Sequence, residues 1–90
     1  MATISVSKLS ETKFEVSVQG RTPTTHTVTV APEYAAKLTG GSVSTEVLVQ
    51  SSFEFLLERE PNTSILRSFD LPVIARYFPE YERVIRGMLG

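Results

Sequence analysis

The stretch that decides the fold is STEVLVQSSFEFLLEREP, residues 44–61. Polar residues recur in it every four positions, which is the spacing of neighbours on one helix face. These polar residues, called here the acidic stripe, are Glu46, Gln50, Glu54 and Glu58. Apolar residues fill the rest of the circumference, so we expect a helix that is covered on more than one side. It is predicted to begin near Ser42 to Thr45, where hydroxyls can cap it, and to end at Pro61.

A helix with so much apolar surface needs a large cover. The chain has 90 residues, enough for one domain with a modest core. The apolar surface of the helix is broad for one thin sheet to cover, and a small core gains stability from a partner. We therefore expect self-association into a homo-oligomer, or association with another protein.

The residues before this helix have the pattern of strands. TISVSKL, TKFEVSV and THTVTV, residues 3–9, 12–18 and 25–30, alternate apolar and polar side chains. This order predicts three antiparallel strands with one apolar face. PEYAAKL, residues 32–38, then predicts a short helix that the glycine pair at 40–41 ends.

The tail, which includes RSFDLPVIARYFPEYERVIRG at residues 67–87, is predicted to form short helical pieces that prolines separate. The apolar positions of these pieces are Ile65, Leu66 and Phe69, then Leu71, Ile74 and Phe78, then Tyr81, Val84, Ile85 and Met88. The predicted fold is α+β: an N-terminal antiparallel sheet of about three strands, covered by one long helix and several short C-terminal helices. We expect a single domain over residues 1–90, strand-rich over 1–31 and helical over 32–90.

Composition excludes several kinds of protein. The net charge of −1 gives no general attraction to nucleic acid or to anionic membranes. Cysteine is absent, so disulfides and thiolate zinc sites are excluded. We expect no membrane association, because no apolar run approaches the ~20 residues that a membrane span needs. The N-terminus lacks the organisation of a signal peptide, so a cytoplasmic location is expected.

Catalytic and metal sites have little support in the residue types. His26 is the only histidine, and a lone histidine without a second nitrogen or thiolate ligand makes a poor metal site. As a general base it would need a nearby nucleophile, and no recognised spacing supplies one. Glutamates four apart on a helix are typical of a solvated face. We expect no catalytic residue, no metal and no cofactor, and predict that the protein is not an enzyme. Whether His26 has a role beyond packing stays open.

Two groups of side chains are candidates for contact with a partner. The acidic stripe suits a basic partner, such as the arginines of a second copy. Tyr77 and Tyr81 lie four apart in the tail, and their hydroxyls need water or a partner. The alternative for these rings is packing, because a core of this size needs most of the aromatic residues. The predicted function is therefore a small non-enzymatic binding or protein-interaction module.

Residues 24–60 resemble ribbon-helix-helix regulators, including many antitoxins, in the order of strand, helix, glycine turn and second helix. In that family, two chains pair their strands into a ribbon that enters the DNA major groove. The DNA contacts that this resemblance implies are Thr25, Thr27 and Thr29 on the strand, with Ser44 and Thr45 at the second helix. The strand carries threonines where that family commonly has basic or amide side chains. The second helix is acidic, which weakens affinity for DNA. DNA binding is the alternative function.

A longer stretch, residues 26–86, is similar to a group of short uncharacterised bacterial proteins. The shared strings are SFEFLLEREP and YFPEY, residues 52–61 and 77–81. This resemblance implies a common lineage and transfers no functional residue.

Overall fold

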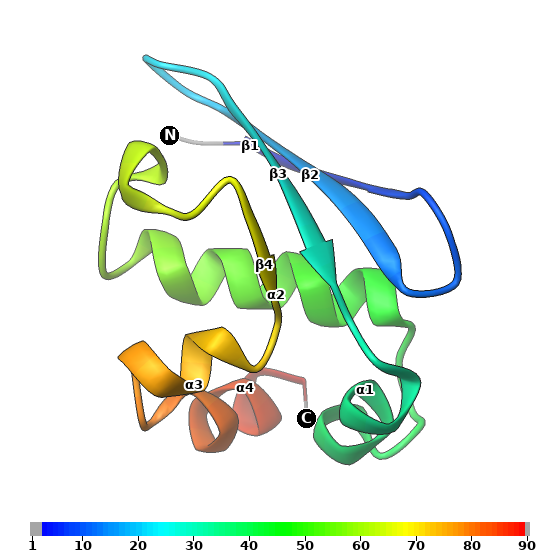
Figure 1. Cartoon of the computed structure of the whole chain (residues 1–90). Helices are drawn as coiled ribbons and strands as arrows, with labels where there is room; N and C mark the ends of the chain where they lie inside the picture. Colours follow the sequence, from blue (N-terminus) through cyan, green and yellow to red (C-terminus); the bar gives the residue numbers. More distant parts are fainter. Residues whose placement is uncertain (1–2, 90) are drawn as a thin grey trace.

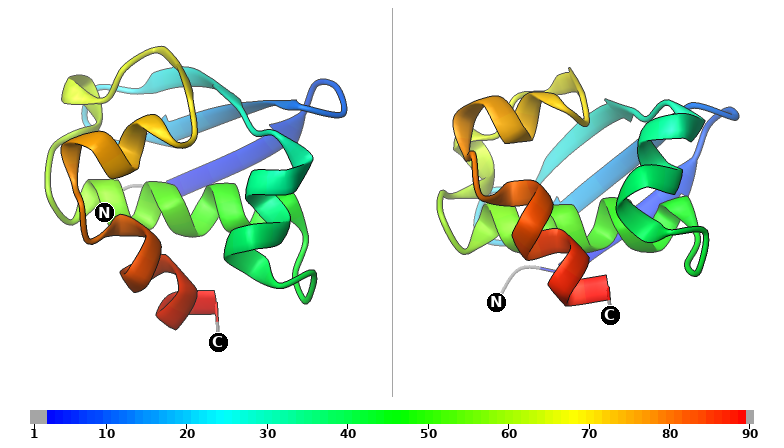
Figure 2. Two further views of the ribbon diagram at one scale, coloured as in Figure 1. Left: turned by 60° about the horizontal axis from the view of Figure 1, so that its bottom comes forward. Right: turned by 90° about the horizontal axis from the view of Figure 1, so that it is seen from below.

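The structure is a computed structural model that describes residues 3–89. Helices α1 to α4 all lie on one face of a four-stranded sheet, with α2 next to the sheet and α1 and α4 on the far side of α2 (Figure 1; Figure 2). The elements are β1 (Thr3–Lys8), β2 (Lys13–Gln19), β3 (Thr24–Thr29), α1 (Pro32–Thr39), α2 (Thr45–Leu57), the 3-10 turn η1 (Asn62–Ser64), β4 (Ser68–Asp70), α3 (Val73–Tyr77) and α4 (Tyr81–Leu89). The α+β class is confirmed.

The sheet has the order β1-β2-β3-β4 and is mixed. The first two pairs are antiparallel, as the alternation of the first third predicts. On β2 and β3, the apolar side chains Phe14, Val16, Val18 and Val28 are buried on the helix side. Hydroxyl side chains such as Thr25 and Thr27 alternate with them and point to the other face.

The fourth strand corrects the prediction for the tail. The local spacing predicts a helical turn at residues 65–69, but residues 65–67 have no regular structure and Ser68–Asp70 form β4, which pairs parallel with β3. The Thr27 N–H donates to the Arg67 carbonyl at 2.8 Å, and the Leu71 N–H donates to the Thr29 carbonyl at 2.9 Å. The Phe69 ring is buried on the helix side of the sheet. Pairing with β3 therefore overrides the local helical spacing.

The helix boundaries follow the capping chemistry of the sequence. Gly40 has a φ of 65°, the left-handed conformation that ends a helix, and its N–H donates to the Ala36 carbonyl. The Ser44 hydroxyl oxygen accepts the Val47 N–H at 3.2 Å and caps α2. The prediction that α2 begins within Ser42 to Thr45 is confirmed.

Helix α2 is covered by its own chain on two sides. It contacts β1 and β2 on one side and α1 and α4 on the other. Leu48, Val49, Phe53 and Phe55 have no exposed surface, and Leu56 is also buried. Of its apolar side chains, only Val47 is largely exposed, at 44%, and Leu57 is partly buried. The premise that α2 needs a partner to cover it is therefore wrong, because α1 and α4 add a second cover to that of the sheet.

Two polar contacts fix α4 in this second cover. The Tyr81 hydroxyl donates to the Ser52 hydroxyl at 2.7 Å, and the Ser52 hydroxyl donates to the Leu48 carbonyl at 2.7 Å, all within the core. The Tyr34 hydroxyl of α1 donates to Glu82 of α4 at 2.8 Å. This hydrogen bond also lowers the pKa of the Glu82 carboxyl, which forms an ion pair with Lys37 at 3.4 Å. The contacts of Glu82 therefore join α4 to α1 on the side of α2 that faces away from the sheet.

Because the chain covers α2 by itself, we predict a monomer in solution. Sedimentation equilibrium at micromolar concentration should give a mass near 10.0 kDa. Val47→Ser, which removes the most exposed apolar side chain of α2, should leave that mass unchanged. A dimer that Val47→Ser dissociates would contradict this prediction.

Candidate functional site

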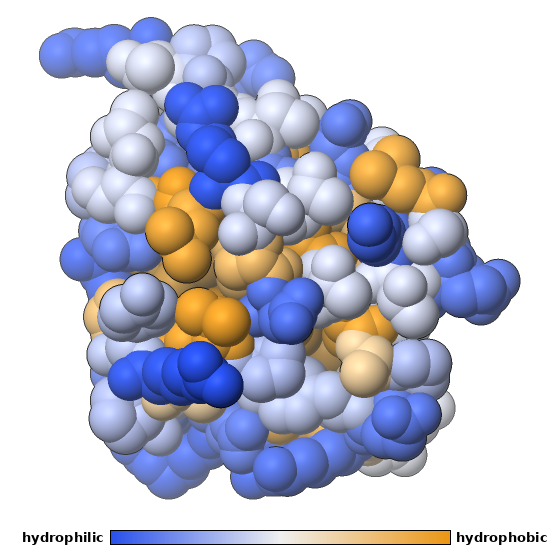
Figure 3. Space-filling model, viewed as in Figure 1, coloured by the Kyte–Doolittle hydropathy of each residue, from blue (hydrophilic) through white to orange (hydrophobic). Residues whose placement is uncertain are grey.

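An apolar pocket opens beside β4, where the chain passes from α2 to α3. In Figure 3, hydrophobic side chains gather around a hollow on the left of this face, next to β4 and α3. The pocket has a volume of about 370 Å³, within the range of ligand-binding pockets. The residues that line it are Leu56, Glu60, Ser64, Ile65, Leu66, Phe69, Val73, Ile74, Tyr77 and Phe78. We refer to it as the apolar pocket.

A hydrogen-bonded chain of side chains, called here the His26 network, holds one wall of the apolar pocket against the sheet. The Asn62 amide donates to the Thr22 carbonyl at 2.7 Å and to the Thr24 hydroxyl at 2.9 Å. The Thr24 hydroxyl donates to Nε2 of His26 at 2.8 Å. Nδ1 of His26 donates to the Leu66 carbonyl at 2.8 Å. Since a carbonyl only accepts, this last bond assigns the proton of the neutral ring to Nδ1.

His26 is fully buried and packs against the Phe53 ring at a centroid distance of 5.3 Å. Burial lowers the pKa of His26 below its ordinary value of 6.5, and the charge of Arg67 lowers it further. The hydrogen bond to Leu66 acts in the opposite direction but is outweighed. Both ring nitrogens are occupied within the fold, so His26 fixes the position of residues 62–66.

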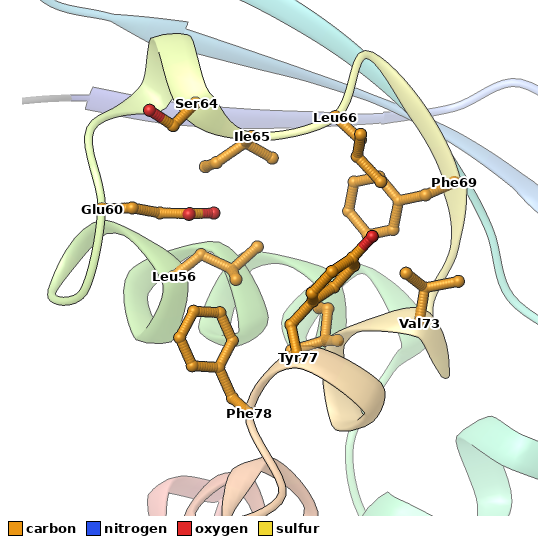
Figure 4. Close-up of a pocket in the computed structure, with 10 residues that line it drawn as sticks. Leu56, Glu60, Ser64, Ile65, Leu66, Phe69, Val73, Tyr77 and Phe78 are labelled. Atoms are coloured by element: carbon orange, nitrogen blue, oxygen red, sulfur yellow. The ribbon is translucent and has the colours of Figure 1, made fainter.

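The apolar pocket has an apolar body and one charged wall. Leu56, Ile65 and Ile74 are buried at its base. Glu60 reaches into it from the end of α2, between Ile65 and Leu56 (Figure 4). Across from Glu60, Tyr77 is 68% exposed. Leu66, 48% exposed, lies on that same side.

The two tyrosines of the tail have different surroundings. Tyr77 ends α3 and lies at the mouth of the apolar pocket, so the structure leaves it available to a partner. Tyr81 begins α4 and is fully buried, with its hydroxyl bonded to Ser52. Tyr81 therefore packs in the core and cannot contact a partner. Packing is the alternative role that the sequence left open for this ring.

The acidic stripe lies in solvent, as its spacing predicts: Glu46, Gln50, Glu54 and Glu58 are all exposed. Three of its members, Gln50, Glu54 and Glu58, line a shallow groove that also touches Thr3 and Ile4 of β1. The stripe and the apolar pocket are thus separate surfaces, although Glu60 touches both.

The residues of the DNA-binding alternative lie apart from the apolar pocket. Thr25, Thr27 and Thr29 point to the outer face of the sheet, but both edges of β3 are already paired, with β2 and with β4. Strand β3 therefore has no free edge with which to form a ribbon with a second chain. The Ser44 oxygen accepts the Val47 N–H, so its cap is occupied, and Thr45 follows as the first residue of α2. This arrangement lacks the geometry that the DNA-binding alternative requires.

Most of the apolar pocket escaped the sequence analysis. The sequence pattern predicts that one helix runs to Glu60 and that Ile65 and Leu66 lie in the next, but α2 ends at Leu57 and residues 65–67 are not helical. The sequence does contain a signal for this segment. Pro61 and Pro72 enclose residues whose helical spacing is too short to form a helix that buries its own apolar side chains. Among residues 3–89, no group of three or more His, Asp or Glu side chains could hold a metal ion, and every buried side-chain nitrogen and oxygen has a hydrogen-bond partner.

Comparison with family models, with curated proteins and with solved structures finds no match to this chain. No helix within residues 3–89 is long and apolar enough to span a membrane.

The buried, neutral His26 predicts a loss of stability in mild acid. Its folded pKa lies below 6.5, so the unfolded chain binds a proton there at a higher pH than the folded chain does. The contribution of His26 is complete above about pH 6.5 and is lost as the pH falls through the folded pKa, by at most about 1.4 kcal/mol per pH unit. Urea unfolding between pH 7.5 and 5 measures this slope.

His26→Gln supplies the control for this measurement. The variant is less stable at neutral pH, but its stability should change less between pH 6.5 and 5, because the chain has no other histidine. Equal slopes for the two proteins would contradict the assignment of a buried neutral His26.

Proposed function

We propose that the protein is a small non-enzymatic binding module whose apolar pocket takes an apolar group with a cationic end. The observation that carries this proposal is a hollow of about 370 Å³ with apolar walls and the single carboxylate of Glu60. Ligand sites in proteins combine an apolar lining with a few polar groups that orient the ligand. The apolar part of the ligand would pack between Leu66 and Tyr77, with its cation beside Glu60.

The lining favours binding over catalysis. Its polar side chains are Glu60, Ser64 and Tyr77. A serine nucleophile needs a base within hydrogen-bond reach, and the only histidine is buried with both ring nitrogens bonded to Thr24 and to Leu66. Residues that bind a ligand without reacting with it need no general base.

Leu66 and Tyr77 are exposed at the opening of the apolar pocket. A bound partner would supply the apolar contacts that these two side chains lack, which supports the proposal. Both side chains lie on one side of the opening (Figure 4). An aromatic ring that a ligand buries against Tyr77 gains the apolar contact and the preferred ring geometry. A partner protein can supply such a group on an aromatic or long basic side chain, which matches the interaction module expected from the sequence.

A matched pair of small probes tests this proposal. 1-Naphthylmethylamine and 1-naphthylacetate have the same ring system and opposite charges. Titration followed by amide chemical shifts should place the amine at Leu66, Phe69 and Tyr77, with affinity roughly threefold to tenfold above that of the carboxylate. Glu60→Gln should remove this preference, since it removes the charge and keeps the shape.

Two alanine variants control for non-specific hydrophobic binding. Leu66→Ala, in the opening, should weaken the amine about threefold or more. Leu9→Ala removes a side chain that is similarly exposed but lies in the hairpin between β1 and β2, and should have no effect. The proposal fails if both probes leave the shifts of the apolar pocket unchanged at millimolar concentration, or if Leu9→Ala weakens binding as much as Leu66→Ala.

A further inference from the structure

We propose that the free edge of β1 accepts an extended basic segment of another protein as a fifth strand of the sheet. This surface lies on the β1 side of the sheet and the apolar pocket on the β4 side, and Glu60 is the one lining residue that they share. The partner is defined by its chemistry: an extended chain with Lys or Arg at alternate positions.

The edge of β1 is open and regular. In the sheet order β1-β2-β3-β4, β1 has a neighbour on one side only. It pairs with β2 over its six residues, Thr3–Lys8, and contains no proline. The other edge strand, β4, has three residues, and Pro72 follows shortly after it. Of the two edges, β1 is the one long enough to pair with an added strand.

The hydrogen-bond pattern identifies which peptide groups face the open edge. Peptide groups of successive residues in a strand point to opposite sides of it. The Thr27 N–H donates to the Arg67 carbonyl on the β4 side, so the peptide groups of its neighbours His26 and Val28 point to β2. Their β2 partners Val16 and Phe14 therefore point to β3.

The intervening residues of β2, Glu15 and Ser17, then point to β1, where their partners are Ser7 and Ser5. The peptide groups of Ile4 and Val6 consequently face outward. An added strand would find these N–H and C=O groups free within the sheet.

A shallow groove, called here the edge groove, runs between this edge and α2. It has a volume of about 560 Å³, and Thr3, Ile4, Gln50, Glu54, Leu57 and Glu58 are among the residues that line it. Figure 2 shows β1 lying along α2. Alternate side chains of an added strand would point to the helix side of the sheet and enter this groove.

Charge selects basic side chains for these positions. Glu54 has no ion-pair partner among residues 3–89, and Glu58 pairs at 3.5 Å with the neighbouring Arg59 while its own side chain stays 74% exposed. A Lys or Arg side chain can lay its apolar stem along Ile4 and Leu57 and place its charge at Glu54 or Glu58.

A second copy of the chain fits this edge less well. Pairing two β1 strands about a two-fold axis would bring the two acidic stripes to the same junction, where like charges repel. Each copy would supply one basic residue on β1, Lys8, against Glu54 and Glu58. The charge pattern therefore favours a foreign basic segment.

The experiment uses the full chain and synthetic ten-residue peptides of alternating lysine and threonine. Titration at low salt should shift the amides of Ile4, Val6 and Glu54, and should slow exchange of the Ile4 and Val6 amides. The matched glutamate–threonine peptide should not bind. Glu54→Gln with Glu58→Gln should weaken the lysine peptide roughly fivefold and reduce its salt dependence. Val47→Ser, on the same helix, serves as the matched control.

A modified peptide separates strand addition from simple attraction of charges. One lysine peptide carries an N-methyl group on every peptide nitrogen. It keeps the charges but offers no N–H to the edge of β1 in either strand direction, so it should lose binding.

Equal binding of the methylated and unmethylated lysine peptides, or of lysine and glutamate peptides, would overturn the proposal. A concentration-dependent dimer that shifts the amides of Ile4 and Val6 would overturn it in favour of a second copy. Failure of the naphthyl probes leaves this result unaffected, because they report on Leu66 and Tyr77 at the opposite edge of the sheet.

Discussion

The structure depends on the need to cover helix α2 on both sides. Its sequence buries five apolar side chains completely or almost completely, and each such burial contributes roughly 1.5–3 kcal/mol relative to exposure. The sheet covers one side of α2, and α4 together with α1 covers the other side. The hydroxyl pair of Ser52 and Tyr81 lies in the second interface, where its bonds remove the cost of burying two polar groups.

The same constraint explains where the two candidate binding surfaces lie. Once α2 is enclosed, the chain must return from its C-terminal end to the sheet, and residues 62–66 make this return. The buried Ile65 and the His26 network hold them in place. The return leaves the apolar pocket on the β4 side. The opposite flank of α2 carries the acidic stripe, next to the open edge of β1.

Local patterns predicted much of this fold and little of the candidate site. The three antiparallel strands and the starts of α1 and α2 follow from alternation, Pro32, the glycine pair and the Ser44 cap. Strand β4 could not be predicted, because its conformation comes from pairing with β3, distant in sequence. Tyr77 and Tyr81 are four apart but do not share a helix face, since the chain breaks at Pro79 between α3 and α4. One is therefore exposed and the other buried.

The sequence by itself determined the class of the fold and the solvent-exposed face of α2, because periodicity and capping are local properties of the chain. Only the tertiary structure decided that this chain covers α2 without help, that His26 is a buried neutral link, and that a pocket lies beside β4. The physical reason is the same in each case. Burial and strand pairing depend on which distant residues meet, and a pattern of neighbours along the chain does not contain that information.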